Sequence, residues 1–257
     1  MHLIVLGCSG SIPGPDAPAS GYLVEAGDRR IAVDLGNGTL AAYQGTGRDP
    51  FDLDALVLSH LHPDHCADFA ALTVLRRYHP APTRDPRREP LPVYAPREAP
   101  TRLAAAYAPD AEELAETDLS DVYTFHALAD ETVDLAGLSM TTGRVAHPCE
   151  AYAMRFDDAG STLCYTGDSG VCSGLDAIAE GADVLLAEAS WTHAPGRPAD
   201  LHLSGREAGE LAARAGVGRL LITHVPPWTE PKAVLAEARA AYSGDVHLVE
   251  AGAVYEI

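Results

Sequence analysis

The chain has 257 residues, 47% of them hydrophobic and 21% charged, which excludes a disordered protein. No apolar run approaches the roughly 18 residues of a membrane span, so no membrane partner is expected. The net charge of −19 disfavours a binder of long nucleic acids, because such a surface repels polyanions at long range.

Short strands and helices alternate along the chain. Residues 1–7 lack the basic segment of a signal peptide, so the expected location is the cytoplasm. Apolar runs predict strands at 3–6, 22–26, 30–34, 55–58, 138–145, 152–156, 162–165, 183–187, 220–223, 246–249 and 253–256. Helical spacing predicts helices at 67–77, 175–180, 204–215 and 231–242, the third capped by Ser204. The proline-rich residues 79–100 are expected to be irregular. This order favours a layered α/β protein in one domain, residues 1–257.

The five cysteines form no C-x-x-C pair, and their number is odd. This pattern indicates reduced, mostly buried thiols rather than a disulfide framework.

A histidine-rich segment, Ser-His-Leu-His-Pro-Asp-His at 59–65, directly follows the strand expected at 55–58. His60 and His62 can point the same way if the backbone stays extended. Asp64 and His65 lie across the turn into the next helix, where they can face a second ion. Imidazole nitrogen with carboxylate oxygen suits Zn²⁺, and also manganese or iron. The segment therefore predicts a metal site.

This segment resembles the H-x-H-x-D-H signature of the metallo-β-lactamase superfamily, and further ligands follow in the order that the family shows. The resemblance implies that His147 completes the first ion's site, that Asp168 bridges two ions and that His224 completes the second site. It also implies two divalent metal ions per chain, with zinc preferred. The implied fold is a four-layer αββα sandwich, in which two mixed β-sheets are flanked by helices.

Two further residues narrow the branch of the family. Glu188 ends the strand expected at 183–187, and His202 stands just before the helix expected at 204–215. This arrangement is similar to the ribonuclease Z branch, whose histidine protonates the leaving oxygen and whose glutamate orients that histidine. Such protonation is worth about 10²–10⁴ in rate, because an alkoxide leaves poorly. Asp64 or Asp168 is expected to orient the attacking hydroxide.

The chain departs from tRNA-processing ribonucleases Z in one respect. Those enzymes usually carry a protruding arm, often between the third histidine and the bridging aspartate, whereas His147 and Asp168 are only 21 residues apart here. The chain resembles more closely the actinobacterial ribonuclease Z-like proteins that hydrolyse cyclic nucleotides. The shared segments are 6–11, 18–22, 77–80, 188–193 and 224–228. Trp191, His193 and Trp228 of these segments could line a nucleotide pocket, and the alternative for the two tryptophans is a place in the core or at a dimer contact.

The predicted function is hydrolysis of a small phosphodiester, a 3′,5′-cyclic nucleotide giving the 5′-monophosphate, by a homodimer. An RNA 3′-processing endonuclease with the same residues is the alternative, and hydrolysis of a lactone or thioester is a third. A large RNA would need a basic docking patch. Only one cluster qualifies for that role, and a solvated loop face is its simpler interpretation: Arg76, Arg77, Arg84, Arg87 and Arg88.

Overall fold

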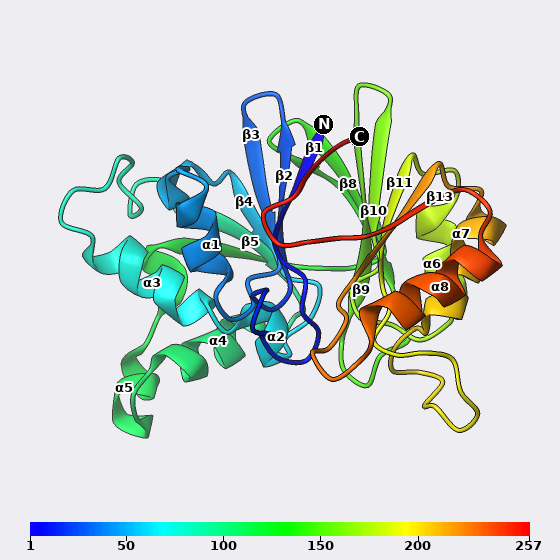
Figure 1. The fold of residues 1–257 in the computed structure, drawn as a ribbon. Coiled ribbons are helices and arrows are strands. Elements are labelled where there is room, and N and C mark those ends of the chain that lie inside the picture. The colour runs from blue at the N-terminus through cyan, green and yellow to red at the C-terminus, as the bar shows by residue number, and fades with distance from the viewer.

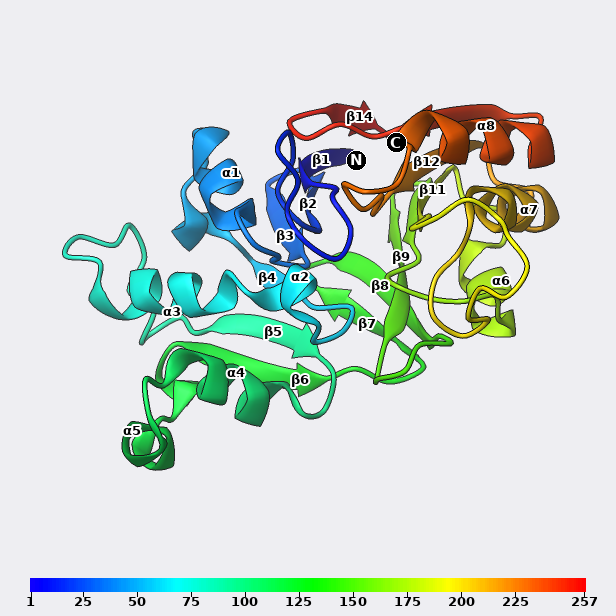
Figure 2. The same cartoon turned by 60° about the horizontal axis from the view of Figure 1, so that its bottom comes forward.

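The computed structural model describes residues 1–257 as two β-sheets packed face to face, with helices over the outer face of each (Figures 1 and 2). Each sheet has seven strands, in the orders β14-β1-β2-β3-β4-β5-β6 and β13-β12-β11-β10-β9-β8-β7. The predicted four-layer αββα sandwich is therefore confirmed. None of the helices combines the length and the hydrophobicity that a membrane span requires.

Strands of the first sheet come from the first half of the chain and from its last residues. They are β1 (His2–Gly7), β2 (Gly21–Ala26), β3 (Arg29–Val33), β4 (Ala55–Val57), β5 (Leu91–Ala95), β6 (Tyr123–Ala127) and β14 (Val254–Glu256). The second sheet contains β7 (Glu131–Leu135), β8 (Leu138–Arg144), β9 (Tyr152–Asp158), β10 (Ser161–Tyr165), β11 (Val184–Glu188), β12 (Arg219–Thr223) and β13 (Asp245–Leu248). The C-terminal strand thus returns to pair with β1.

Helices cover both outer faces. Those from the first half are α1 (Thr39–Gly45), α2 (Pro63–Cys66), α3 (Phe69–Tyr78), α4 (Ala99–Tyr107) and α5 (Ala111–Glu116), with 3₁₀ turns at Pro50–Asp52 and Leu119–Asp121. Those from the second half are α6 (Ser173–Ala179), α7 (Gly205–Ala215) and α8 (Pro231–Ala241). Ser204 caps α7 in a reciprocal pair with Glu207, as its position before the helix predicts.

Side-chain alternation in β1 shows how one strand serves two cores. Leu3 and Val5 belong to the cluster between the sheets, whereas Ile4 and Leu6 belong to the cluster under α1, α3 and α4. A third cluster lies between the second sheet and α6, α7 and α8. Successive strand residues point to opposite faces, so a continuous apolar run is what a strand covered on both sides requires.

The strands β4, β8, β10, β11 and β12 all end at the edge where the functional residues gather. In the second sheet, β8 and β10 are both antiparallel to β9, and β10, β11 and β12 are mutually parallel. Their carboxyl ends therefore meet at one edge, as do the loops that follow them. Open α/β sheets commonly place their ligand sites at such an edge.

Two of the sequence-based element predictions need correction. Residues 79–100 are not wholly irregular, because they contain β5, which pairs in parallel with β4 and β6. The helix predicted at 67–77 begins at Phe69 and is preceded by the separate short helix α2. Pro63 starts α2 at a position where its missing N–H costs nothing.

Candidate metal centre and active site

The loop after β4 and the short helix α2 supply four of the predicted metal ligands. His60 is fully buried on the loop, and His62 is the N-cap of α2 with an extended backbone. Asp64 and His65 lie within α2 and are buried. The extended backbone lets His60 and His62 face the same space, and the helical turn directs the other two elsewhere.

The remaining predicted ligands come from the ends of other strands. His147 follows β8, Asp168 follows β10 and His224 follows β12 directly. His224 adopts a left-handed backbone, with φ of 57°, and its side chain is fully buried. A non-glycine residue in that conformation stores strain that the surrounding structure must compensate, and such strain is common at functional sites.

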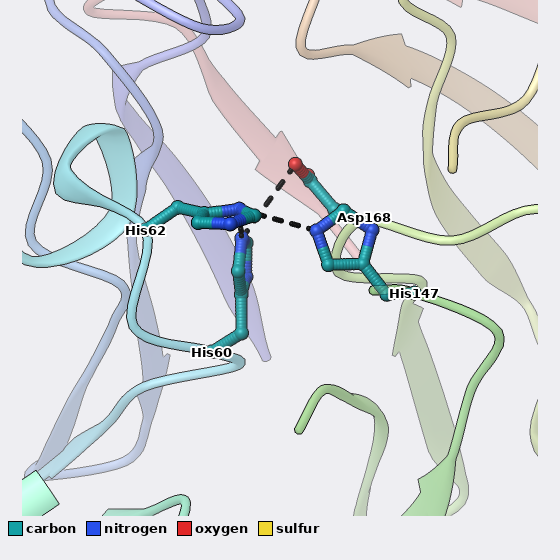
Figure 3. A group of neighbouring side chains, drawn as sticks. All are labelled: His60, His62, His147 and Asp168. Carbon is teal, nitrogen blue, oxygen red and sulfur yellow. Dashed lines mark hydrogen bonds and ion pairs between the residues drawn. The ribbon is translucent and has the colours of Figure 1, made fainter. Parts of the chain in front are cut away.

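The structure brings the seven predicted ligands together in two groups that share Asp168. One group holds His60, His62, His147 and Asp168, and the other holds Asp64, His65, Asp168 and His224. Within each group, one donor atom from every residue lies within 4.8 Å of the others. Figure 3 shows the first group, with three imidazole rings and the carboxylate converging on one point.

Donor spacing in the first group fits a small cation. His62 Nδ1 lies 3.0 Å from His60 Nε2 and 3.2 Å from His147 Nε2. Zinc–nitrogen bonds of about 2.0–2.1 Å at tetrahedral angles place two ligand nitrogens about 3.3–3.4 Å apart. Burial lowers the pKa of His60 and His62, and lowers that of His147 to about 4. The three imidazoles are therefore neutral and have lone pairs free for a metal.

Asp168 supplies the second test of the fit. Its side chain is buried, and its Oδ1 atom has no hydrogen-bond partner. Burial opposes ionisation of this carboxyl, yet the neighbouring His224 and His65 hold its pKa well below the usual range. His65 Nε2 lies 3.2 Å from this oxygen, and an ionised, buried carboxylate oxygen that accepts no hydrogen bond is costly unless a cation balances its charge. The cluster is thus able to bind metal ions, whereas the role of each ligand stays a prediction.

Outer hydrogen bonds fix how the imidazoles face inward. Asp34 Oδ2 lies 2.8 Å from His65 Nδ1 and also accepts hydrogen bonds from Ser59 and Tyr165. Ser59 Oγ lies 3.1 Å from His60 Nδ1. Holding the outer nitrogen of each ring leaves the inner nitrogen as the donor toward the site. Asp34 and Ser59 are not among the predicted site residues, although they lie at the ends of the segments 30–34 and 59–65.

His202 and Glu188 form the predicted pair beside the two ligand groups. His202 Nδ1 lies 2.9 Å from Glu188 Oε1, and Glu188 is fully buried. Burial opposes the charged form of His202, but the charge and hydrogen bond of Glu188 raise its pKa to about 9. His202 is therefore an imidazolium at neutral pH. Because Nδ1 is held by Glu188, Nε2 is the nitrogen that can reach a substrate.

The glycine-rich loop after β1 approaches the second ligand group through its backbone. Ser11 N donates to Asp64 Oδ2 at 2.8 Å. A Cβ on Gly10 would lie 2.4 Å from the backbone oxygen of His224, so only glycine allows this approach. The loop thus orients a predicted ligand, a role that the sequence analysis did not assign to it.

The three residues predicted to line a nucleotide pocket lie in different surroundings. Trp191 packs its ring against His202, with centroids 5.2 Å apart. His193 lies toward α7 and α8, where its backbone N–H binds the Glu237 carboxylate. Trp228 is 67% exposed on the loop after His224. Trp191 therefore borders the site, and His193 does not point toward it.

The arginine cluster considered as an RNA-docking patch is largely neutralised. Arg76 is buried, donates to backbone carbonyls and stacks near Tyr123. Arg77 forms an ion pair with Asp121. Arg84 lies near Asp52 and Asp54, and Arg88 lies near Asp85. These guanidinium groups do not form a free basic surface.

Comparisons with known proteins agree with the geometry. The family described as beta-lactamase superfamily domain matches residues 29–225. Rv1339 of Mycobacterium tuberculosis, described as an uncharacterized protein, is 46% identical over 260 residues, covering 100% of this chain and 92% of the relative. Ribonuclease Z of Mycobacterium bovis is 28% identical over 277 residues, covering 97% and 98%.

A solved structure extends the similarity to the whole fold. YhfI of Bacillus subtilis, described as a probable metallo-hydrolase, has a crystal structure that matches with a TM-score of 0.83 at 29% identity. The match covers 99% of this chain and 98% of YhfI. The chain belongs to the beta-lactamase superfamily, in its ribonuclease Z-like branch, and is a metal-dependent hydrolase.

Proposed function

We propose that this hydrolase is a dinuclear phosphodiesterase that converts a 3′,5′-cyclic nucleotide to the 5′-monophosphate. The observation that carries the proposal is the His202–Glu188 pair beside the two ligand groups. Two bound divalent ions would neutralise charge on the phosphoryl oxygens and activate water. His60, His62, His147 and Asp168 would hold one ion, and the second would be held by Asp64, His65, Asp168 and His224.

His202 has the protonation state and geometry of a general acid. In the proposed step, water supplies the new oxygen on phosphorus and releases one proton to solvent, the bond from phosphorus to the 3′-oxygen breaks, and His202 Nε2 gives its proton to that oxygen. Glu188 holds the ring through Nδ1 and stabilises its positive charge. Asp64 or Asp168 orients the attacking water. A thioester releases a weakly basic thiolate that has less need of such a donor, which argues against a thioester substrate.

A small substrate is favoured over precursor tRNA by two features. The interval from His147 to Asp168 is filled by the hairpin of β9 and β10, which leaves no room for an arm. The surface carries a net charge of −19, and the arginine cluster at 76–88 is mostly buried or paired. An RNA 3′-processing activity is the second candidate, supported by the similarity to ribonuclease Z.

The metal and the assembly are also part of the proposal. Five histidines and two carboxylates form a donor set that suits zinc, with manganese or iron as alternatives. We expect a homodimer, which light scattering of the purified protein can test.

A substrate panel with metal-loaded protein tests the proposal. It contains cyclic AMP, cyclic GMP, a 2′,3′-cyclic nucleotide, bis(p-nitrophenyl) phosphate, a precursor tRNA and a lactone. The expected result is fastest turnover of a 3′,5′-cyclic nucleotide, with the 5′-monophosphate as the only product. Protein stripped by a chelator is the control. Faster turnover of the RNA or the lactone, or a 3′-monophosphate product, would overturn the proposal.

A further inference from the structure

A buried serine, Ser190, joins the acid pair to the second ligand group. It lies two residues after β11 and is 3% exposed. Its Oγ atom is 3.0 Å from His224 Nδ1 and 3.1 Å from Glu188 Oε2. The same side chain therefore contacts a predicted metal ligand and the residue that holds the acid.

The direction of these hydrogen bonds follows from what each atom can donate. His224 turns its Nε2 into the second ligand group, toward Asp64 and His65, so with a metal bound to Nε2 the ring would carry its proton on Nδ1 and donate it to Ser190 Oγ. Ser190 then has one proton left, which it donates to Glu188 Oε2. The other oxygen of Glu188 faces His202 Nδ1.

Glu188 has no direct hydrogen bond to His224. The distance from Glu188 Oε2 to His224 Nδ1 is 3.9 Å, too long for a hydrogen bond. Ser190 bridges this gap with two hydrogen bonds of ordinary length. Its hydroxyl is thus the link between the carboxylate and the imidazole.

The first ligand group has a matching serine without an acid attached. Ser59 Oγ lies 3.1 Å from His60 Nδ1 and donates to Asp34 Oδ2 at 2.8 Å. Asp34 holds His65, not His202. Both serines therefore join a predicted ligand to a buried carboxylate, and only Glu188 also holds the proton donor.

We propose that Ser190 is a positioning residue that couples the alignment of His202 to the occupancy of the second metal site. A metal that fixes His224 would fix Ser190, and through it the rotamer of Glu188 and the ring of His202. The coupling is reciprocal, so Glu188 would in turn strengthen metal binding through Ser190. The role of the aligned acid rests on the proposed function, whereas the link to metal binding does not.

A double-mutant cycle on metal affinity tests the link without any substrate. The variants are Ser190→Ala, Glu188→Gln and both together, each titrated with Zn²⁺ against a chromophoric chelator. We expect each single substitution to lower the affinity for one of the two ions by about 10–100-fold. The double variant should bind metal no more weakly than Ser190→Ala alone, because Glu188 acts on metal binding only through the serine.

The matched control is a second double-mutant cycle, in which Ser59→Ala takes the place of Ser190→Ala. Ser59→Ala should also weaken the binding of one ion. In the double variant its effect on metal affinity should multiply with that of Glu188→Gln, because Ser59 is joined to Asp34 instead. Thermal unfolding of each apoprotein checks that the fold is kept. If the effects of Ser190→Ala and Glu188→Gln on metal affinity multiply in the double variant, the proposal would be overturned.

Leaving-group selectivity supplies a second readout at saturating metal. Ser190→Ala should lose more turnover on diphenyl phosphate than on bis(p-nitrophenyl) phosphate, whereas Ser59→Ala should lose the same factor on both. If Ser190→Ala, like Ser59→Ala, loses the same factor of turnover on both substrates, the proposal would also be overturned. If the effects of Ser190→Ala and Glu188→Gln on metal affinity do not multiply, but the protein cleaves no phosphodiester, the proposed function would be wrong. The link between Ser190 and metal binding would still hold.

Discussion

Replacing His202 with alanine separates leaving-group protonation from metal binding. The side chain belongs to neither group of predicted ligands that share Asp168, and in its own cluster with Glu188 and His224 its Nδ1 is held by Glu188, so both ions and the substrate affinity should be kept. Its pKa of about 9 means that the ring is mostly protonated at pH 7. The variant therefore removes a proton donor.

The expected loss depends on the leaving group. With cyclic AMP, whose leaving alkoxide is strongly basic, turnover should fall by roughly 10²–10⁴. That range corresponds to about 3–5 kcal/mol of transition-state stabilisation. With bis(p-nitrophenyl) phosphate the loss should be much smaller, because p-nitrophenolate departs without a proton. At saturating metal, Glu188→Gln should show the same dependence on the leaving group more weakly, since Glu188 acts on the leaving group through His202.

The assay measures kcat and KM for both substrates, with metal content determined on the same preparations. Equal losses on both substrates would mean that His202 serves binding or structure, and the general-acid role would then be refuted. Loss of one ion in the variant would also refute the reasoning, because it would make His202 a ligand.

Four further results are expected. Asp168→Ala should lose activity and much of the bound metal, as metal analysis would show, because Asp168 belongs to both ligand groups; full retention of both would contradict a dinuclear site. Precursor tRNA should be cleaved far more slowly than a cyclic nucleotide, and efficient processing at physiological salt would reverse that ranking. Cys164, buried with a pKa of about 12, should resist a thiol reagent at pH 8, while Cys8 and Cys66, with pKa values of about 11, react slowly; all five cysteines should react after unfolding. Finally, kcat/KM for cyclic AMP should rise from low to physiological salt, because salt screens the repulsion between an acidic protein and an anion; a fall would indicate a local basic field.

The strands that the sequence predicts well are those with continuous apolar runs. Val184–Glu188 and Arg219–Thr223 are covered on both faces, so their pattern is unbroken and their ends are predicted within a residue. The edge strands Tyr123–Ala127 and Glu131–Leu135 were missed, because most of their side chains are exposed or half-buried. Leu91–Ala95 was missed because prolines surround it, and one lies within it.

At the site, the sequence analysis identified the residues that have a recognisable spacing and missed those that support them. The histidines of the segment at 59–65 can be recognised from their spacing alone. The roles of Asp34 and Ser190 depend on which strands are neighbours, because Asp34 and its partner His65 follow the adjacent strands β3 and β4, and Ser190 and its partner His224 follow the adjacent strands β11 and β12. Their partners His65 and His224 are 31 and 34 residues away in the chain. No local pattern encodes such contacts, because serine and aspartate are common near strand ends.

The protein and its proposed substrate carry charges of the same sign, and the length of the substrate decides whether that matters. Inside the site, two divalent cations would outweigh the carboxylates of Asp64 and Asp168, so a phosphodiester meets positive charge at contact distance. Beyond about 8 Å, salt screens the acidic surface, and a cyclic nucleotide does not extend much further than that. A tRNA extends several times as far and would lie along surface that carries 37 acidic against 18 basic residues. The same charge distribution therefore permits a small anion and opposes a long one.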